Sequence, residues 1–192
     1  MAIALDGTYA TSAAAVGSSK TLAFTVSANA NRYLLVGIGQ GSGEPAVTGV
    51  TWNGAALTLL KDSGVTADGF RRSYLYGLVA PGAATANIVV TLGGAGNERT
   101  NFAAAVYTGV DQTTPIGTPV SALVAGGNPT VNVSSAVGEV VVDATGVSQD
   151  STLVVGGGQT PRVNVTDGSS SDLGMSEEAG AGTVTMSWTG TS

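Results

Sequence analysis

The chain has 192 residues, with 7 basic and 13 acidic side chains, a formal net charge of −6, and neither Cys nor His. This length fits a domain of ordinary size that is able to bury a core. Without Cys and His, disulfides, thiolate metal sites, thiol catalysis and the usual general base are excluded. The acidic balance argues against nucleic acid as a partner, because phosphate contacts need clustered Lys and Arg.

Taken in chain order, short β-branched or alternating runs bounded by Gly, Asn, Asp and Pro predict strands throughout. Only residues 10–16 resemble a helix, and that run is too short to form a stable one. We therefore predict an all-β fold, a two-sheet antiparallel sandwich that is either jelly-roll-like or built from two related halves. The predicted strands are Ile3–Tyr9, Thr21–Ser27, Tyr33–Gly39, Val47–Trp52, Phe70–Val79, Ala86–Leu92, Asn101–Gly109, Thr130–Ser134, Glu139–Gly146, Thr152–Val155, Arg162–Val165 and Thr183–Thr189.

An internal repeat is visible in the sequence. Residues 24–36 align without gaps to 131–143, and residues 82–91 align to 180–189 in the same order. Chance similarity between Thr- and Val-rich strands is the alternative explanation. Two matches in the same order favour a duplication, with similar halves at about 20–118 and 119–192 of a single domain spanning 1–192.

The start of the chain has no basic region and no apolar run of signal-peptide length. No stretch reaches the roughly 18 consecutive apolar residues of a membrane-spanning helix. These features predict synthesis in a host cytoplasm and no membrane partner. The lack of Cys, the few Lys and the Thr- and Gly-rich composition instead suit a protein that works outside a cell. A virion protein satisfies both expectations, because lysis releases it without secretion.

Several motifs resemble an uncharacterised β-sandwich family found in tailed-phage virion proteins and bacterial surface proteins. They include Val50-Thr-Trp-Asn-Gly-Ala-Ala-Leu-Thr, Tyr74-Leu-Tyr-Gly-Leu-Val-Ala-Pro-Gly and the most specific piece, Gly109-Val-Asp-Gln-Thr-Thr-Pro. The resemblance covers roughly residues 21–189 and implies a structural or surface role without enzymatic activity. The chain departs from the family pattern after Ser187-Trp-Thr, where a further strand is expected.

Three candidate sites have a structural explanation that we favour. The run Gly37-Ile-Gly-Gln-Gly-Ser-Gly lacks the spacing of a phosphate-binding loop and predicts a flexible loop between strands. The segment 111–115 could be a recognition loop, but its Asp, Thr and Pro are typical of a turn. The aromatic residues of predicted strands could stack on a sugar, although alternating strands normally direct such residues into the core; they are Trp52, Tyr74, Tyr76 and Trp188.

Acidic side chains occur in pairs in Gly- and Ser-rich segments. Calcium prefers such oxygen ligands, but neither Asp62 with Asp68 nor Asp167 with Asp172 has the spacing of a known calcium loop. We interpret both pairs as turn residues, and Glu177 with Glu178 as an exposed pair. The sequence therefore predicts no catalytic residue, no metal site and no cofactor.

These patterns predict a non-enzymatic virion structural protein of a tailed phage. Decoration of the capsid exterior is the first expectation, and a tail or fibre component is the second. The expected partners are copies of the same chain and other virion proteins, namely the major capsid or tail protein. The alternative from another class is a carbohydrate-binding or adhesin module that binds a surface glycan.

The repeat also predicts an interaction edge. Asn101–Gly109 is expected to return beside Ala86–Leu92, whereas almost no chain follows the matching strand Thr183–Thr189. That strand should then have an open edge, which is an aggregation hazard unless covered. We expect Ala2–Tyr9 to cover it within the chain, or a neighbouring subunit to do so. The interaction residues predicted on this basis are Val184, Met186, Trp188, Ile3 and Leu5.

Overall fold

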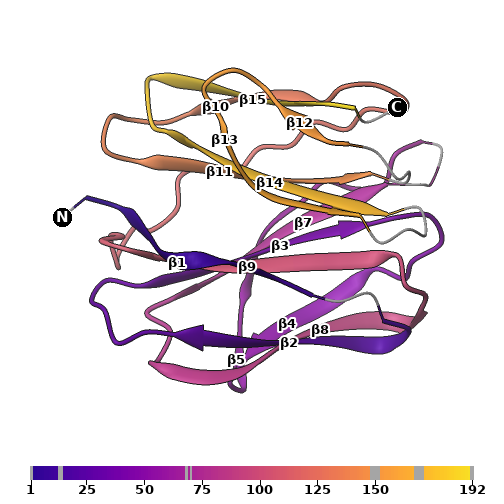
Figure 1. The fold of residues 1–192 in the computed structure, drawn as a ribbon, viewed down its shortest axis with the longest axis horizontal. Helices are drawn as coiled ribbons and strands as arrows, with labels where there is room; N and C mark the ends of the chain where they lie inside the picture. Colours follow the sequence, from indigo (N-terminus) through magenta and orange to yellow (C-terminus); the bar gives the residue numbers. More distant parts are fainter. Residues whose placement is uncertain are drawn as a thin grey trace.

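A computed structural model describes residues 2–12, 15–67, 69, 71–147, 152–166 and 171–190, and all regular structure in these ranges is β-strand (Figure 1). No helix in this part of the chain is long and apolar enough to cross a membrane. The strands are β1 (Ala4–Thr11), β2 (Gly17–Val26), β3 (Tyr33–Gln40), β4 (Val47–Trp52), β5 (Ala55–Ala56), β6 (Thr58–Asp62), β7 (Arg72–Val79), β8 (Ala84–Gly96), β9 (Thr100–Thr108), β10 (Thr130–Ser134), β11 (Val140–Val147), β12 (Val154–Val155), β13 (Thr160–Thr166), β14 (Asp172–Ala179) and β15 (Thr183–Thr189).

The strands form four antiparallel sheets stacked as layers. Their orders are β2-β8-β4-β5, β1-β9-β3-β7-β6, β11-β14-β13 and β10-β15-β12. Figure 1 shows them in this sequence from bottom to top, so each half of the chain makes its own two-layer sandwich. The predicted all-β antiparallel sandwich class is confirmed, with four sheets in place of two, while the jelly-roll detail stays a prediction.

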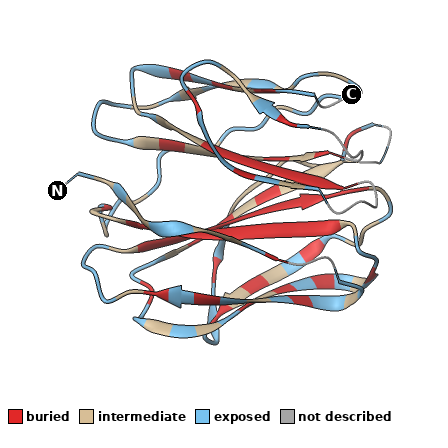
Figure 2. Cartoon of the chain, viewed as in Figure 1, coloured by how far each residue is buried: buried red, intermediate tan, exposed pale blue. Residues whose placement is uncertain are grey.

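Apolar side chains fill all three spaces between the layers. Phe24, Leu34 and Trp52 belong to the core of the first sandwich, and Val184 with Met186 belongs to that of the second. A further core, containing Leu35 and Met175, joins the two sandwiches back to back. Every residue of β3 is buried, because both faces of its sheet are covered (Figure 2). Period-2 alternation is therefore lost in β3, as expected for a strand buried on both faces.

The two sandwiches repeat the same strand order. The order β2-β8-β4 recurs as β10-β15-β12, and β3-β7-β6 recurs as β11-β14-β13. A register shift between Leu59 and Lys61 in the β6–β7 pair recurs between Pro161 and Val163 in the β13–β14 pair. In the described part of the second half, no strand takes the place that β9 has beside β3. This difference leaves β11 at the edge of its sheet.

The structure corrects the interaction edge predicted on β15: on the β12 side Thr183–Met186 has no strand partner among the described residues, but the N-terminal segment does not cover this edge. That strand pairs with β10 along Thr183–Ser187 and with β12 at Trp188 and Thr189. The N-terminal strand β1 instead pairs with β9. The expected cover by Ala2–Tyr9 was wrong because β9 does not return beside β8. It crosses to the other sheet and lies between β1 and β3, so the missing neighbour belongs to β11.

Three strands were not predicted from the sequence: β6, β14 and the two-residue β5. β6 follows the short β5 hairpin without a clear turn signal, and β14 is the polar segment Asp172–Ala179 with no β-branched residue. Local propensity gives no reason for β14 to be a strand. It is held by long pairings with β11 on one side and β13 on the other. Tertiary pairing thus outweighs local preference here.

The glycine run at 37–43 is neither a phosphate loop nor, over Gly37–Gln40, a flexible loop, because those residues belong to the buried strand β3. Its glycines allow the two sandwiches to approach closely. A Cβ atom on Gly146 of β11 would lie 3.0 Å from the Cα of Gly39 and 2.6 Å from the carbonyl oxygen of Arg72. Such contacts are with backbone and cannot be relieved by a side-chain rotation, so the spacing of the layers depends on this glycine pair.

We expect Gly146→Ala to lower the free energy of unfolding by about 1–3 kcal/mol through overpacking. Gly182→Ala is the matched control, because a Cβ there meets nothing within 4 Å. That control should be neutral or slightly stabilising, since Ala restricts the unfolded chain. Urea unfolding curves measure both effects. Equal midpoints for the two variants would show that the layers do not touch at Gly146.

Candidate functional site

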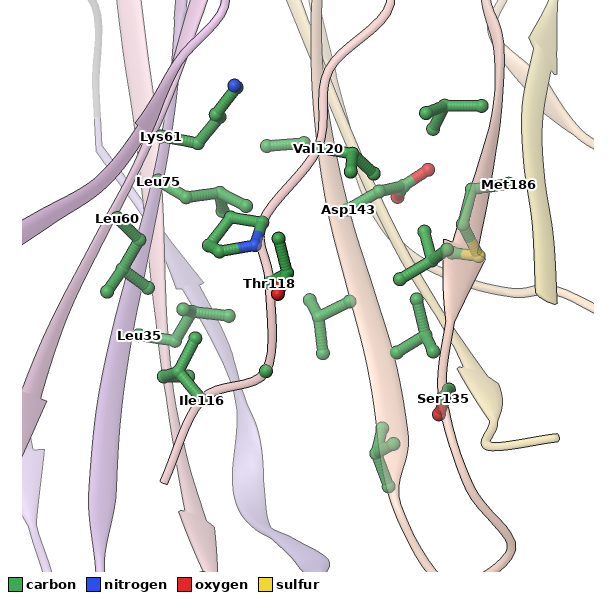
Figure 3. A pocket seen from close by; sticks show the side chains of 18 of the residues that line it. Leu35, Leu60, Lys61, Leu75, Ile116, Thr118, Val120, Ser135, Asp143 and Met186 are labelled. Atoms are coloured by element: carbon green, nitrogen blue, oxygen red, sulfur yellow. The ribbon is translucent and has the colours of Figure 1, made fainter. Parts of the chain in front are cut away.

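A pocket lies at the unpaired edge of β11, between the two sandwiches. Its volume is about 360 Å³, and it is bounded by the five-stranded sheet, β10, β11 and the segment 114–122 that links the halves. Figure 3 shows Leu35, Leu60 and Leu75 on one side of the linker. Asp143 and Met186 lie on the opposite side of the linker. The pocket therefore spans the opening where the second sandwich lacks a strand.

The linker covers this opening without closing it. Residues 109–129 form no strand, and the linker carries prolines at positions 115 and 119. Proline has no N–H to donate to a ladder, which explains why the linker passes β11 without pairing to it. Ile116 and Val120 are 39% and 40% exposed. The linker thus packs loosely against the pocket and leaves apolar groups in contact with solvent.

Asp143 is the one carboxylate of β11, and its side chain faces the interior of the second sandwich. It accepts hydrogen bonds from the Ser176 amide at 2.9 Å, the Ser176 hydroxyl at 2.7 Å and Trp188 Nε1 at 2.7 Å. Burial raises the pKa of Asp143 to about 6, because desolvation penalises its charge more than these three donors stabilise it. The carboxylate holds β14 and β15 against β11.

A buried glutamine bonds to the second edge of β15 at Ser187, next to this carboxylate. Gln159 Oε1 accepts from the amides of Ser187 at 2.8 Å and Gly156 at 3.2 Å, and its Nε2 donates to Ser176 Oγ at 2.7 Å. The Gln159 side chain thus provides an acceptor for the Ser187 amide, which would pair with the backbone of β12 if that strand were longer. Together with Gly156, this side chain extends the paired part of the edge to Ser187, whereas Thr183–Met186 has no strand partner there among the described residues.

A second polar cluster joins the sandwiches on the far side of the shared core. The hydroxyls of Tyr9 and Tyr107 are 2.5 Å apart, and Tyr107 donates to Glu177 Oε2 at 2.6 Å. Arg162 forms an ion pair with the same carboxylate. Burial is the main cause that raises the pKa of both tyrosines above their usual range, so they stay protonated and act as donors. The predicted exposed pair Glu177–Glu178 is wrong, because both residues are half-buried.

The remaining acidic residues form no cation site in the described ranges. Asp62 pairs with Arg72, whose guanidinium lowers the pKa of that carboxyl and lies 4.8 Å from the Tyr74 ring centroid. Asp172 is buried in β14, while Asp68 and Asp167 lie outside the described residues. Among the residues that the structure describes, no three Asp or Glu side chains gather as metal ligands.

The predicted turn after β9 is confirmed. Asp111 Oδ1 accepts from the amides of Thr113 at 2.7 Å and Thr114 at 2.9 Å, and these bonds lower the pKa of Asp111. The core interpretation of the aromatic residues is confirmed as well. All four are buried, with at most 4% of each exposed; they are Trp52, Tyr74, Tyr76 and Trp188.

The predicted interaction residues divide into two groups. Met186, Trp188 and Ile3 line the pocket at β11. Val184 packs inside the second sandwich, and Leu5 packs in the core between the sandwiches. None of the five is exposed: three are buried and Ile3 and Leu5 are half-buried.

Sequence reasoning missed Asp143 and the edge of β11. A usable signal was present in the alternation of this strand. Val141, Asp143 and Thr145 share one face, and a carboxylate beside a core valine on that face indicates a buried polar group. No local signal marks the open edge, because an edge is defined by which strand is absent.

Comparison of the chain with models of known protein families, with curated proteins and with solved structures gives no match. The fold and the pocket therefore define the protein as an all-β double sandwich with an exposed strand edge, and the function is argued from these features.

Proposed function

We propose that this protein is a non-enzymatic structural component of a tailed-phage virion, with decoration of the capsid exterior as its role and a tail or fibre position as the second choice. The sequence resemblance to virion β-sandwich proteins motivates the proposal. The structural observation that carries it is the use of two carboxylates that lie between strands and layers. Asp143 and Glu177 accept hydrogen bonds from groups on neighbouring strands and layers. These carboxylates therefore stabilise the fold, as expected of a rigid structural protein.

The carbohydrate-binding alternative receives no support from the aromatic residues. A sugar platform needs exposed rings, whereas Trp52 and Trp188 are 1% and 3% exposed. The outer faces of the first and last sheets alternate buried and exposed residues along their strands (Figure 2). Small hydroxyl side chains such as Thr25 and Thr185 occupy exposed positions there, which suits a smooth, weakly charged particle surface.

The test is made on particles banded in a density gradient from a lysate of cells that carry the gene. The proposal predicts that the chain bands with DNA-filled particles in many copies per particle and that antibodies label intact particles. An unrelated cytoplasmic protein of similar mass is the control for trapping. Recovery of the chain only in the soluble fractions contradicts the proposal, as does hydrolase turnover that one Asp→Asn change abolishes.

A further inference from the structure

The outer edge of β11 is an unpaired strand edge that faces the pocket. Among the described residues, β11 pairs with β14 alone. The Gly180 amide donates to the Glu139 carbonyl at 2.8 Å, so Glu139 and Gly180 are a hydrogen-bonded pair, and every second pair along the two strands is hydrogen-bonded as well. Because bonded and non-bonded pairs alternate, the backbone groups of Val140, Val142 and Ala144 point away from β14. These three residues are half-buried and line the pocket.

The first half of the chain shows which kind of strand pairs with the corresponding edge. Its corresponding strand, β3, pairs on that edge with β9 along its whole length, from Tyr33 opposite Tyr107 to Gln40 opposite Thr100. Residues 100–107 of β9 are all buried and uncharged, and three consecutive alanines form its centre. A strand buried on both faces must be apolar on both faces. The vacant place beside β11 therefore calls for the same kind of segment.

Apolar side chains line both sides of the vacant place beside β11, which suits an apolar strand. Leu60 and Leu75 line the pocket on the side of the five-stranded sheet, and Val131 and Met186 line it on the side of β10. The carboxylate of Asp143 already accepts three hydrogen bonds. The charged residues of the lining are Lys61, Asp111, Glu139 and Asp143. The other lining residues are uncharged, so an uncharged occupant suits most of this surface.

We propose that β11 accepts an extended, uncharged, apolar segment of a partner polypeptide, which adds as an antiparallel strand in the place corresponding to β9. The linker at 114–122 moves outward when the segment binds, since it has no ladder bonds to β11 to break. A second copy of this chain is a poor donor, because its own β9 is buried between β1 and β3 and would have to unfold. The inference holds whether or not the chain belongs to a virion.

The test uses the full chain, labelled with ¹⁵N, and a synthetic peptide with the β9 sequence Asn101–Thr108. We expect saturable shift changes along β11 and slower exchange of the outward amides of Val140, Val142 and Ala144. At a peptide concentration ten times the dissociation constant, exchange of these amides should slow about tenfold. Changes confined to β2 or β5, or none at all at saturating peptide, overturn the proposal.

Two N-methylated peptides show whether binding uses ladder hydrogen bonds. In each, alternate amides are methylated, so one peptide loses the donors that face β11 and the other loses the donors that face solvent. We expect only the first to lose binding. Equal binding of both contradicts strand addition and indicates simple burial of apolar side chains. This control does not depend on the folding of any variant.

Two proline variants of the protein complete the test. Val142→Pro removes an outward N–H and obstructs the edge without removing a bond to β14, so peptide binding should be lost while the dispersed spectrum remains. Val137→Pro is the control, because Val137 is 92% exposed and precedes Gly138 in the turn from Ala136 to Glu139, a position that suits proline. The Val137→Pro variant should bind the peptide as the parent does.

Self-association is tested without peptide. If the protection of the β11 amides from exchange rises with protein concentration, a second copy of the chain is the occupant and the proposal is overturned.

Discussion

Replacing Trp188 by Ala should lower the free energy of unfolding by about 3–5 kcal/mol, the usual cost of removing a buried tryptophan side chain. Trp188 packs with Val147 and Leu153 in the second sandwich, and its ring fits against Gly174, where a Cβ would approach it to 2.8 Å. The substitution leaves a cavity and also removes a donor from the buried carboxylate of Asp143. Chemical denaturation monitored by far-UV circular dichroism measures the effect.

Conservative variants separate the hydrogen bond from the packing. Trp188→Phe keeps an aromatic ring but loses the indole N–H that donates to Asp143. Trp52→Phe in the first sandwich makes the same change in size, and Trp52 Nε1 has no acceptor among the described residues. A hydrogen bond to a charged group contributes about 1.5–3 kcal/mol, so Trp188→Phe should cost more than Trp52→Phe by about that amount. Equal costs would mean that the Trp188–Asp143 bond contributes nothing.

The stability of the protein should also fall as the pH rises through the pKa of Asp143. This pKa is raised from 3.8 to about 6 by burial, so the native state binds a proton more tightly than the unfolded state does. The stabilisation from that proton is complete below the unfolded pKa and is lost as the pH rises through the folded one. At about 1.4 kcal/mol per pKa unit, the loss between about pH 3 and about pH 7 is about 3 kcal/mol.

Asp143→Asn isolates this effect, because the other titrating groups are common to both proteins. The free energy of unfolding of the parent minus that of Asp143→Asn should decrease from acid to neutral pH, with its midpoint between 3.8 and about 6. Urea unfolding at a series of pH values gives the difference. A difference that is constant, or that increases with pH, contradicts a raised pKa. Direct titration of the Asp143 carboxyl by NMR provides an independent check.

Several features of the structure could be predicted because they depend on local pattern. Alternating or continuous β-branched runs predicted most of the strands, including β3, β9 and β11, and the aromatic residues were correctly placed in the core. The turn at Asp111 followed from side-chain chemistry that acts within four residues. The polar strand β14 was missed for the same reason, since its conformation depends on two distant partners.

The sequence by itself determined that the protein is all-β, that it has no thiol or imidazole chemistry, and that its Trp side chains are core residues. The tertiary structure decided which strands are neighbours. It placed β9 beside β3, paired β15 with β10 along one edge and with β12 at one end of the other, and left β11 without a second partner among the described strands. It also buried Asp143 and joined the two sandwiches through Gly39 and Gly146. Strand pairing joins segments far apart in the chain, and each strand's own pattern is compatible with several neighbours, so only the assembled sheets distinguish a paired edge from an open one.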